Sequence, residues 1–269
     1  MNMNMKRLFS RLLPAVAGMM LFSSITAFAQ LNAEDKAIYD QMTAKSNAMS
    51  DANLYYHTNM TMSDGTNTMA MTMDMNALFK NMNHPEQLQF LNKSIMTTDG
   101  QSMASVSWYK DGYTYSEVAG EKTKVKTNMA DAMKAAMGAA SSLNTPSNFL
   151  SSISIKTEGD KRILYYTMDS AKMNDYMKQT FTQMGVSGLL DGMTIKVHDV
   201  KGSYTLTPDN FFSNAKIIMT MDMSVKDEKL TINMDGDVEI LNPGQPVEIV
   251  LPDSAGYKDI KDITSADAA

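Results

Sequence analysis

The chain has 269 residues, no cysteine, 28 methionines and a formal net charge of −6 at pH 7. The absence of cysteine excludes disulfides, thiol catalysis, zinc–thiolate sites and thiol redox chemistry. The negative charge argues against a surface built for nucleic acid and equally against an anionic membrane surface, because both require clustered basic residues.

The first 29 residues have the pattern of a secretory signal peptide. Lys6, Arg7 and Arg11 precede an apolar stretch, and Ala27-Phe28-Ala29 forms a small-x-small cleavage site before Gln30. The apolar stretch is too short for a transmembrane anchor, and no cysteine follows it for lipid attachment. We therefore expect an exported protein of the periplasm or the cell exterior that is not lipid-anchored. Its net charge changes from −6 to −9 once the three basic residues leave with the signal peptide.

Residues 30–252 are predicted to form one α+β domain in which helices interrupt a long series of strands. Apolar residues at helical spacing predict amphipathic helices over 34–50, 128–142 and 170–184, the last capped by Ser170 and ended by Gly185. Apolar residues at every second position, separated by turn signals, predict antiparallel strands. These are a hairpin around Ser63-Asp64-Gly65 and strands over 86–98, 101–109, 113–118, 121–127, 149–157, 161–168, 193–207, 211–226 and 229–241. Residues 243–251 are expected to be extended, and the tail 253–269 to be loosely ordered.

The pentapeptide Met-Thr-Met-Asp-Met occurs twice, at 71–75 and at 219–223. In a strand, successive side chains point to opposite faces, so each copy places its methionines on one face and Thr and Asp on the other. The apolar series continues on the same face, from Met69 in the first copy and from Ile217 to Val225 in the second. Both copies are therefore predicted to be half-buried strands with their methionines toward the core.

Two stretches resemble a known family of carriers. They are Trp108-Tyr109-Lys110-Asp111-Gly112-Tyr113-Thr114-Tyr115, followed by Gly-Glu-Lys at 120–122, and Asn242-Pro243-Gly244-Gln245-Pro246-Val247-Glu248-Ile249. With the order of elements, they resemble the LolA/LolB/LppX-like superfamily of bacterial lipoprotein and lipid carriers. The resemblance implies a curved antiparallel β half-barrel of about ten strands, with amphipathic helices covering a concave face that holds acyl chains, and no catalysis.

Two departures limit what the resemblance implies. The lipid-anchored members carry an N-terminal cysteine, which is absent here. The soluble lipoprotein carrier holds its closed state with an arginine inside the barrel, whereas Arg162, the only arginine after the signal peptide, matches no such position. The resemblance therefore implies binding of an apolar ligand rather than a cycle of lipoprotein shuttling.

Methionine is flexible and polarisable, so a methionine-rich sheet face can repack around varied apolar partners. We therefore expect a non-catalytic binding protein for a lipid or an acylated molecule. The expected lining from the strands is Met71, Met73, Met219 and Met221, and from the third helix Met173, Met177 and Phe181. Tyr56 and Tyr166 are expected to turn inward, with their hydroxyls at the rim for a ligand headgroup.

Two alternatives use the same residues differently. A filled methionine-rich core would make the protein a structural or sensor domain that meets an envelope partner through its polar sheet face. Thioether clusters also bind Cu(I), and Met69-Ala70-Met71-Thr72-Met73-Asp74-Met75 with His84 nearby would allow a copper site. Copper ranks below the other two, because copper-binding methionine segments are usually irregular and these have a clear strand period.

Catalytic and metal sites are not predicted. His57, His84 and His198 are far apart and lack metal-ligand spacing, so each is interpreted as a surface or strand-face residue. Gly185-Val186-Ser187-Gly188 is not the nucleophile elbow of hydrolases and follows a helix rather than a strand. We expect no cofactor and no enzymatic activity.

Overall fold

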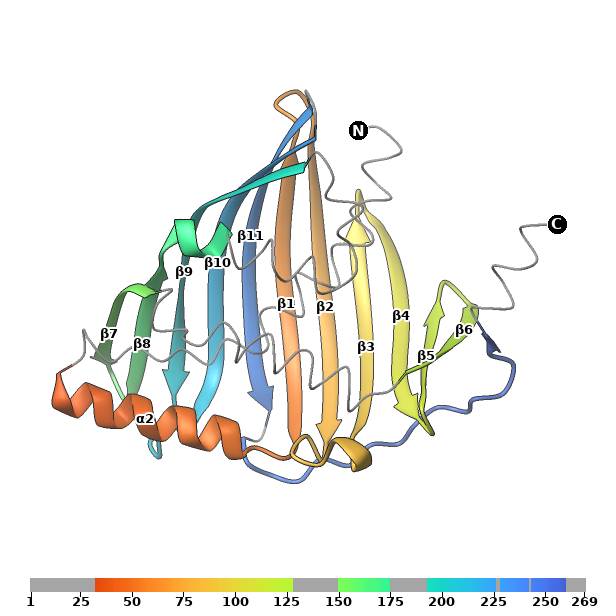
Figure 1. The fold of residues 1–269 in the computed structure, drawn as a ribbon, viewed down its shortest axis with the longest axis horizontal. Helices are drawn as coiled ribbons and strands as arrows, with labels where there is room; N and C mark the ends of the chain where they lie inside the picture. The colour runs from red at the N-terminus through yellow and green to blue at the C-terminus, as the bar shows by residue number, and fades with distance from the viewer. Residues whose placement is uncertain (1–31, 128–149, 175–192, 226–227, 242, 260–269) are drawn as a thin grey trace.

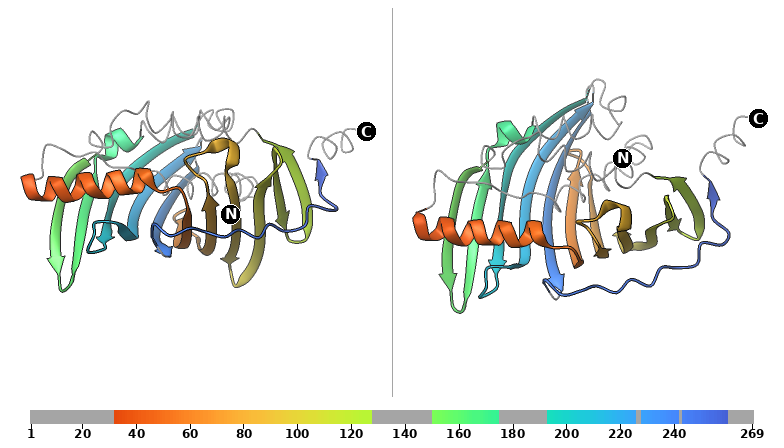
Figure 2. Two further views of the ribbon diagram at one scale, coloured as in Figure 1. Left: turned by 90° about the horizontal axis from the view of Figure 1, so that it is seen from below. Right: turned by 60° about the horizontal axis from the view of Figure 1, so that its bottom comes forward.

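The computed structural model describes residues 32–127, 150–174, 193–225, 228–241 and 243–259 (Figure 1). The predicted signal peptide, the helix expected over 128–142 and most of the helix expected over 170–184 lie outside the described residues. Within them, twelve strands form a single open, curved sheet, where about ten strands were expected (Figure 2). The strands are β1 (Ala52–Ser63), β2 (Thr68–Lys80), β3 (Gln89–Thr98), β4 (Gln101–Lys110), β5 (Tyr113–Val118), β6 (Glu121–Lys126), β7 (Leu150–Glu158), β8 (Lys161–Met168), β9 (Met193–Leu206), β10 (Phe212–Val225), β11 (Glu228–Leu241) and β12 (Lys258–Asp259).

The strand order is β12-β6-β5-β4-β3-β2-β1-β11-β10-β9-β8-β7. Two antiparallel meanders, β1 to β6 and β7 to β11, therefore meet where β1 pairs with β11. The parallel pair β6–β12 is the exception to the antiparallel pattern. The meander predicted from alternation and turn signals is confirmed, and the long-range pairing of β1 with β11 places the second Met-Thr-Met-Asp-Met copy close to the first.

The tight turns follow the turn chemistry of the sequence. At Asp99-Gly100 and Asp111-Gly112 both residues have positive φ, between 52° and 81°. Such paired left-handed residues form the two-residue turns whose twist matches that of antiparallel strands. The loop at 64–67 is longer, and the carboxylate of Asp64 accepts hydrogen bonds from the backbone N–H groups of Thr66 and Asn67.

One long helix, α2 (Ala33–Ala48), is described before the sheet, together with the short 3₁₀ helix η1 (Pro85–Gln87). The Asn32 side chain caps α2 by accepting from the backbone N–H of Asp35, which satisfies one free donor of the first turn. Tyr39 and Met42 form the narrow apolar stripe of α2 and are buried in the main core cluster. In Figure 1, α2 crosses β7, β8, β9 and β10 near one end of these strands.

The sheet buries different faces at its two ends. From β2 through β1 and β11 to β8, one face of the sheet is buried. We call it the methionine face, because it carries Met60, Met71, Met219 and Met234. The opposite face, here called the polar face, carries Asp74 and the other outward residues of these strands. At β3, β4 and β5 the buried apolar side chains lie on the opposite side of the sheet, that is, on the continuation of the polar face. There Leu91, Trp108 and Tyr115 lie directly opposite one another on neighbouring strands and form a buried row.

Residues 243–259, which we call the strap, cover this apolar row. Ile249, Leu251 and Tyr257 of the strap pack against Trp108 and its neighbours, and the strap ends in β12 beside β6 (Figure 2). The extended conformation expected for 243–251 holds from residue 246 onward, whereas 243–245 form a turn in which Gly244 has a φ of 73° (Figure 2). The expectation of a loosely ordered chain from Asp253 does not hold for 253–259, because Tyr257 is buried at the edge of the Trp108 and Tyr115 rings.

Candidate functional site

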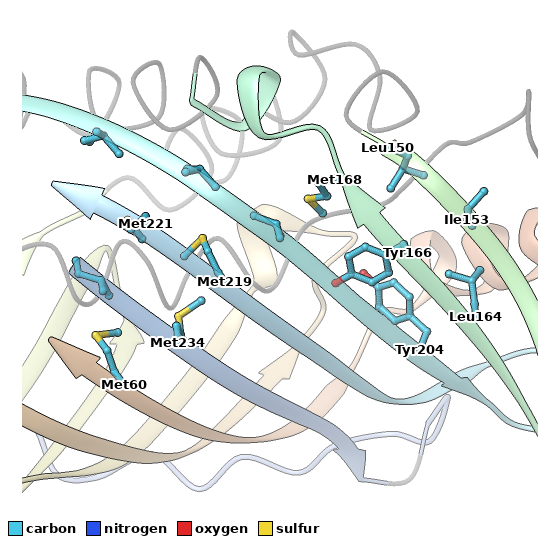
Figure 3. Packing of buried hydrophobic residues seen from close by; sticks show 14 of the residues in the cluster. Met60, Leu150, Ile153, Leu164, Tyr166, Met168, Tyr204, Met219, Met221 and Met234 are labelled. Carbon is cyan, nitrogen blue, oxygen red and sulfur yellow. The ribbon is translucent and has the colours of Figure 1, made fainter. Parts of the chain in front are cut away.

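Four methionines form a continuous row across the centre of the methionine face. Met71 of β2 lies opposite Met60 of β1, Met60 opposite Met234 of β11, and Met234 opposite Met219 of β10. Each of the four has less than a tenth of its surface exposed. Figure 3 shows Met60, Met234 and Met219 on three neighbouring strands of this row. Directly opposed side chains are the closest neighbours in an antiparallel sheet, so the four thioethers form one surface.

A second row runs parallel to the first. Its members lie directly opposite one another on neighbouring strands: Met69, Met62, Ile232, Met221 and Val197. Met69 is half-buried, and the other four are buried. The two Met-Thr-Met-Asp-Met copies thus lie on β2 and β10, on either side of the central pair β1–β11. The prediction that both copies turn their methionines toward the core is confirmed for every methionine in them, although Met73 is only half-buried.

The predicted tyrosines face inward, but their hydroxyls do not reach a rim. Tyr166 is 4% exposed, and its ring stacks on Tyr204 with centroids 5.4 Å apart (Figure 3). Burial raises the pKa of Tyr166 well above its ordinary value, and the neighbouring Tyr204 raises it further. Tyr56 is 1% exposed, burial raises its pKa as well, and its hydroxyl bonds to no described residue. Both phenols are therefore neutral groups inside the core, which differs from the expected headgroup contacts at the surface.

The Tyr166 ring occupies a place that only glycine leaves open. Gly202 of β9 lies directly opposite Tyr166, and a Cβ on Gly202 would stand 2.5 Å from the ring carbon Cζ of Tyr166. It would lie even closer to the Tyr166 hydroxyl and to the carbonyl oxygen of Lys216. A glycine within a strand often marks such a close approach. Sequence reasoning did not single out Gly202, although an isolated glycine within a strand pattern was the available signal.

The third predicted helix begins as expected but with a different cap. Its first turn, 170–174, is described, and the carboxylate of Asp169 accepts from the backbone N–H groups of Ala171 and Lys172. Asp169 is therefore the N-cap, not Ser170. The expected lining residue Met173 is half-buried against the main cluster, whereas Met177 and Phe181 lie outside the described residues.

This first helical turn is attached to a β-bulge in β9. The register between β9 and β10 shifts beside His198, which has no directly opposed partner. Ser170 donates its hydroxyl hydrogen to the His198 carbonyl, and the Asn174 side chain accepts from the backbone N–H of Val197 at 2.6 Å. Two backbone groups at the bulge are thus satisfied by the helix, and this fixes where Met173 meets the methionine face.

On the polar face, each Met-Thr-Met-Asp-Met aspartate contacts a histidine of a neighbouring strand. Asp74 lies 2.7 Å from Nδ1 of His57 and also accepts from the Tyr55 hydroxyl. These two hydrogen bonds, His57 first, lower the pKa of Asp74. The interpretation of His57 as a strand-face residue is confirmed. The aspartate that both motifs share was the available signal for its partner.

The second aspartate, Asp222, is held more tightly. Its carboxylate lies 2.9 Å from Nε2 of His198, 2.9 Å from Nζ of Lys229 and 2.7 Å from the Thr231 hydroxyl. Burial alone would raise the pKa of Asp222, but the hydrogen bonds from Lys229, Thr231 and His198 outweigh it and the pKa is lowered. Asp222 is thus an ionised group that joins β9, β10 and β11 on the polar face.

The described residues contain no group of three or more His, Asp or Glu side chains placed to hold a metal ion. None of the helices among them has the length and apolar character needed to cross a membrane. The polar clusters on the two aspartates link neighbouring strands, and the apolar methionine face is the candidate site.

Comparison with curated proteins gives no match. Among solved structures, lipoprotein LppX of Mycobacterium tuberculosis is similar at 7% identity, with 80% of this chain and 97% of that chain covered and a TM-score of 0.42. The ywiB protein of Bacillus subtilis follows at 11% identity, 74% and 99% coverage and a TM-score of 0.25. A DUF1329 family protein from Desulfovibrio piger has 10% identity, 76% and 92% coverage and a TM-score of 0.27. Membership of the LolA/LolB/LppX-like superfamily stays a prediction. A family model matches residues 34–258, and the chain belongs to that family, described as a family of unknown function, DUF6612.

Proposed function

We propose that this protein is an exported, non-catalytic binding protein for an apolar ligand, a lipid or an acylated molecule, and that the methionine face is its binding surface. The observation that carries the proposal is the pair of registered rows centred on Met60 and Met62. They give the sheet a continuous apolar surface five strands wide, or about 19 Å at the usual strand spacing.

The choice of side chains favours binding over simple packing. A sheet core is usually built from β-branched and aromatic residues, which have few rotamers and specify one packing. Here the central row consists of four methionines, whose flexible side chains refill space when a neighbour changes shape. Burial of an acyl chain against such a surface contributes about 25 cal/mol per Å² of apolar surface removed from water.

A pair of variants on one strand tests the proposal. Met73 is half-buried on the methionine face, and Thr72 is its half-buried neighbour on the polar face of β2. Met73→Asp should abolish uptake of a fluorescent fatty acid, whereas Thr72→Asp adds the same charge to the other face and should leave uptake intact. Far-UV circular dichroism and a urea midpoint for both variants separate loss of binding from loss of folding. Equal uptake by two folded variants would contradict the proposal.

A second candidate function is binding of Cu(I), because the four central methionines offer adjacent soft thioether ligands. Met60→Leu with Met234→Leu keeps the volume of the core and removes two central sulfurs. If copper is the ligand, this variant should lose Cu(I) in an anaerobic competition titration. If an apolar molecule is the ligand, the variant should still bind fatty acid, because leucine keeps the surface apolar. Failure of the wild-type protein to bind either probe would favour the filled-core structural or sensor protein.

A further inference from the structure

One face of the sheet gathers lysines in a protein whose total charge is negative. The register of β3 to β6 places five lysines on the polar face, beside the Trp108 and Tyr115 rings. We call this set the lysine face: Lys93, Lys110, Lys122, Lys124 and Lys126. Four of the five are exposed, and Lys124 is half-exposed. The acidic residues in register on this face are Glu117 and Asp259. Asp111 lies in the adjacent turn, and Glu248 and Asp253 are exposed on the strap.

The ammonium groups of this face are weakly paired. Lys122 lies 3.9 Å from Glu117, and its Nζ lies 5.4 Å from the centre of the Tyr257 ring. Nζ of Lys124 lies 5.2 Å from the centre of the Tyr113 ring. Lys93, Lys110 and Lys126 form no ion pair within the described part of the chain. Aromatic contacts hold the lysine stems without neutralising their charge, and on the strands themselves the five lysines outnumber the two acidic residues in register with them.

The strap adds an exposed apolar side chain on the same side of the sheet. Ile249 and Leu251 pack inward against the aromatic cluster, and because side chains alternate along an extended chain, Val250 points away from it. Val250 is 86% exposed, the most exposed large apolar residue of the described chain. An apolar side chain presented beside several lysines is the arrangement by which peripheral proteins enter the interface of a bilayer.

We propose that the lysine face and Val250 dock this protein on the surface of a membrane that contains anionic lipid. The biological reason for docking rests on the proposed function, since a protein that takes up lipid must meet a bilayer. The residues of the docking surface, however, do not belong to the methionine face. It departs from the expectation, drawn from net charge alone, that anionic membranes are unsuitable partners. The acidic remainder of the molecule is repelled by such a surface, so the charge asymmetry also fixes the orientation of docking.

Vesicle co-sedimentation of the mature protein tests this directly. Wild type should bind vesicles of phosphatidylglycerol and phosphatidylcholine, ignore vesicles of phosphatidylcholine alone, and dissociate as salt is added. The triple variant K122Q/K124Q/K126Q should lose roughly a hundredfold in affinity, since each lysine near an anionic surface contributes about fivefold. Val250→Ser should lose about fivefold, with little dependence on salt.

A matched control removes the same charge elsewhere. Lys161, Lys196 and Lys201 are exposed on β8 and β9, so K161Q/K196Q/K201Q should bind vesicles as wild type does. Equal losses in the two triple variants, or no preference for anionic vesicles, would overturn the proposal. The protein could also bind polyphosphate as tightly as vesicles through these lysines, with vesicle binding unchanged in Val250→Ser. That result would overturn the proposal in favour of a soluble anionic polymer as the ligand.

The two proposals fail separately. Fatty-acid uptake by K122Q/K124Q/K126Q from solution should equal that of wild type, because the lysine face and the methionine face lie on opposite sides of the sheet. A wild-type protein that binds anionic vesicles through these lysines but takes up no apolar ligand would refute the proposed function and leave the docking surface in place. Uptake of fatty acid without any binding to anionic vesicles would refute the docking surface and leave the proposed function in place.

Discussion

The two aspartates of the repeated motif occupy equivalent positions in the sequence but are shielded from water to different degrees. The Asp222 side chain is 16% exposed and the Asp74 side chain 42% exposed. An exposed ion pair contributes about 0–1 kcal/mol, whereas a hydrogen bond to a charge that is shielded from water contributes about 1.5–3 kcal/mol. We therefore expect Asp222→Ala to lower the free energy of unfolding by about 2 kcal/mol, and Asp74→Ala by less than about 1 kcal/mol.

The pH dependence of this loss follows from the direction of the pKa shift. The pKa of Asp222 in the folded protein lies below its unfolded value of 3.8. Its contribution to stability is therefore fully present above the unfolded pKa and is lost as the pH falls through the folded pKa. The difference between wild type and Asp222→Ala should be constant near neutral pH and should shrink below about pH 4.

Urea unfolding followed by Trp108 fluorescence measures this difference, because Trp108 is the single tryptophan and is fully buried. Far-UV circular dichroism of the same samples checks that unfolding is two-state. Equal losses for Asp222→Ala and Asp74→Ala would refute the argument from shielding. A loss at Asp222 that persists unchanged in acid would refute the assignment of the charged carboxylate as the stabilising form.

Three further changes test individual contacts in the same unfolding assay. Gly202→Ala should cost about 2–3 kcal/mol, since its Cβ would stand 2.5 Å from Cζ of Tyr166, and an unchanged urea midpoint would contradict this. Tyr56→Phe should be neutral or stabilise by up to about 1 kcal/mol, because its hydroxyl is buried without a described partner, and a clear loss of stability would disprove it. Tyr257→Ala should cost about 3 kcal/mol and shift the emission of Trp108 to the red, as the strap leaves the indole; an unshifted spectrum would show that the strap does not shield it.

Local chemistry made much of the sheet predictable. Strand period and the Asp-Gly turns are properties of a few adjacent residues. The sequence therefore predicts correctly the hairpins at Asp99-Gly100 and Asp111-Gly112 and the face to which both methionine motifs turn. The meeting of the two meanders was not predictable in this way. It depends on pairing between β1 and β11, which lie far apart in the chain, and period alone does not reveal a partner.

The face that each strand buries was also beyond a local reading. The alternation of β3 and β4 is compatible with burial of either face, and the strap decides it by covering Leu91 and Trp108. The tail was expected to be loose because Asp, Ser and Ala dominate its composition. Tyr257 nevertheless anchors residues 253–259 through burial and a hydrogen bond to Glu117, and β12 pairs with β6 beyond it. Burial, and secondarily that hydrogen bond, raises the pKa of Tyr257 to about 12.

The candidate site shows the same division. Met71, Met219 and Met221 were placed by period, whereas the single row that joins the two motifs through Met60 and Met234 required the register. The tyrosine hydroxyls were expected at a rim, because sequence gives the face of a side chain but not how deeply its far end is buried.

Native mass spectrometry of the mature protein, purified from a bacterial envelope and followed by denaturation and lipid extraction, would show whether the methionine face holds an apolar ligand. We expect an added mass of a lipid or acylated molecule that is lost on denaturation and is absent from a Met73→Asp variant. A bare polypeptide mass that stays bare after incubation with envelope lipids would contradict ligand binding on the methionine face, and an added mass of copper would replace the lipid with a metal.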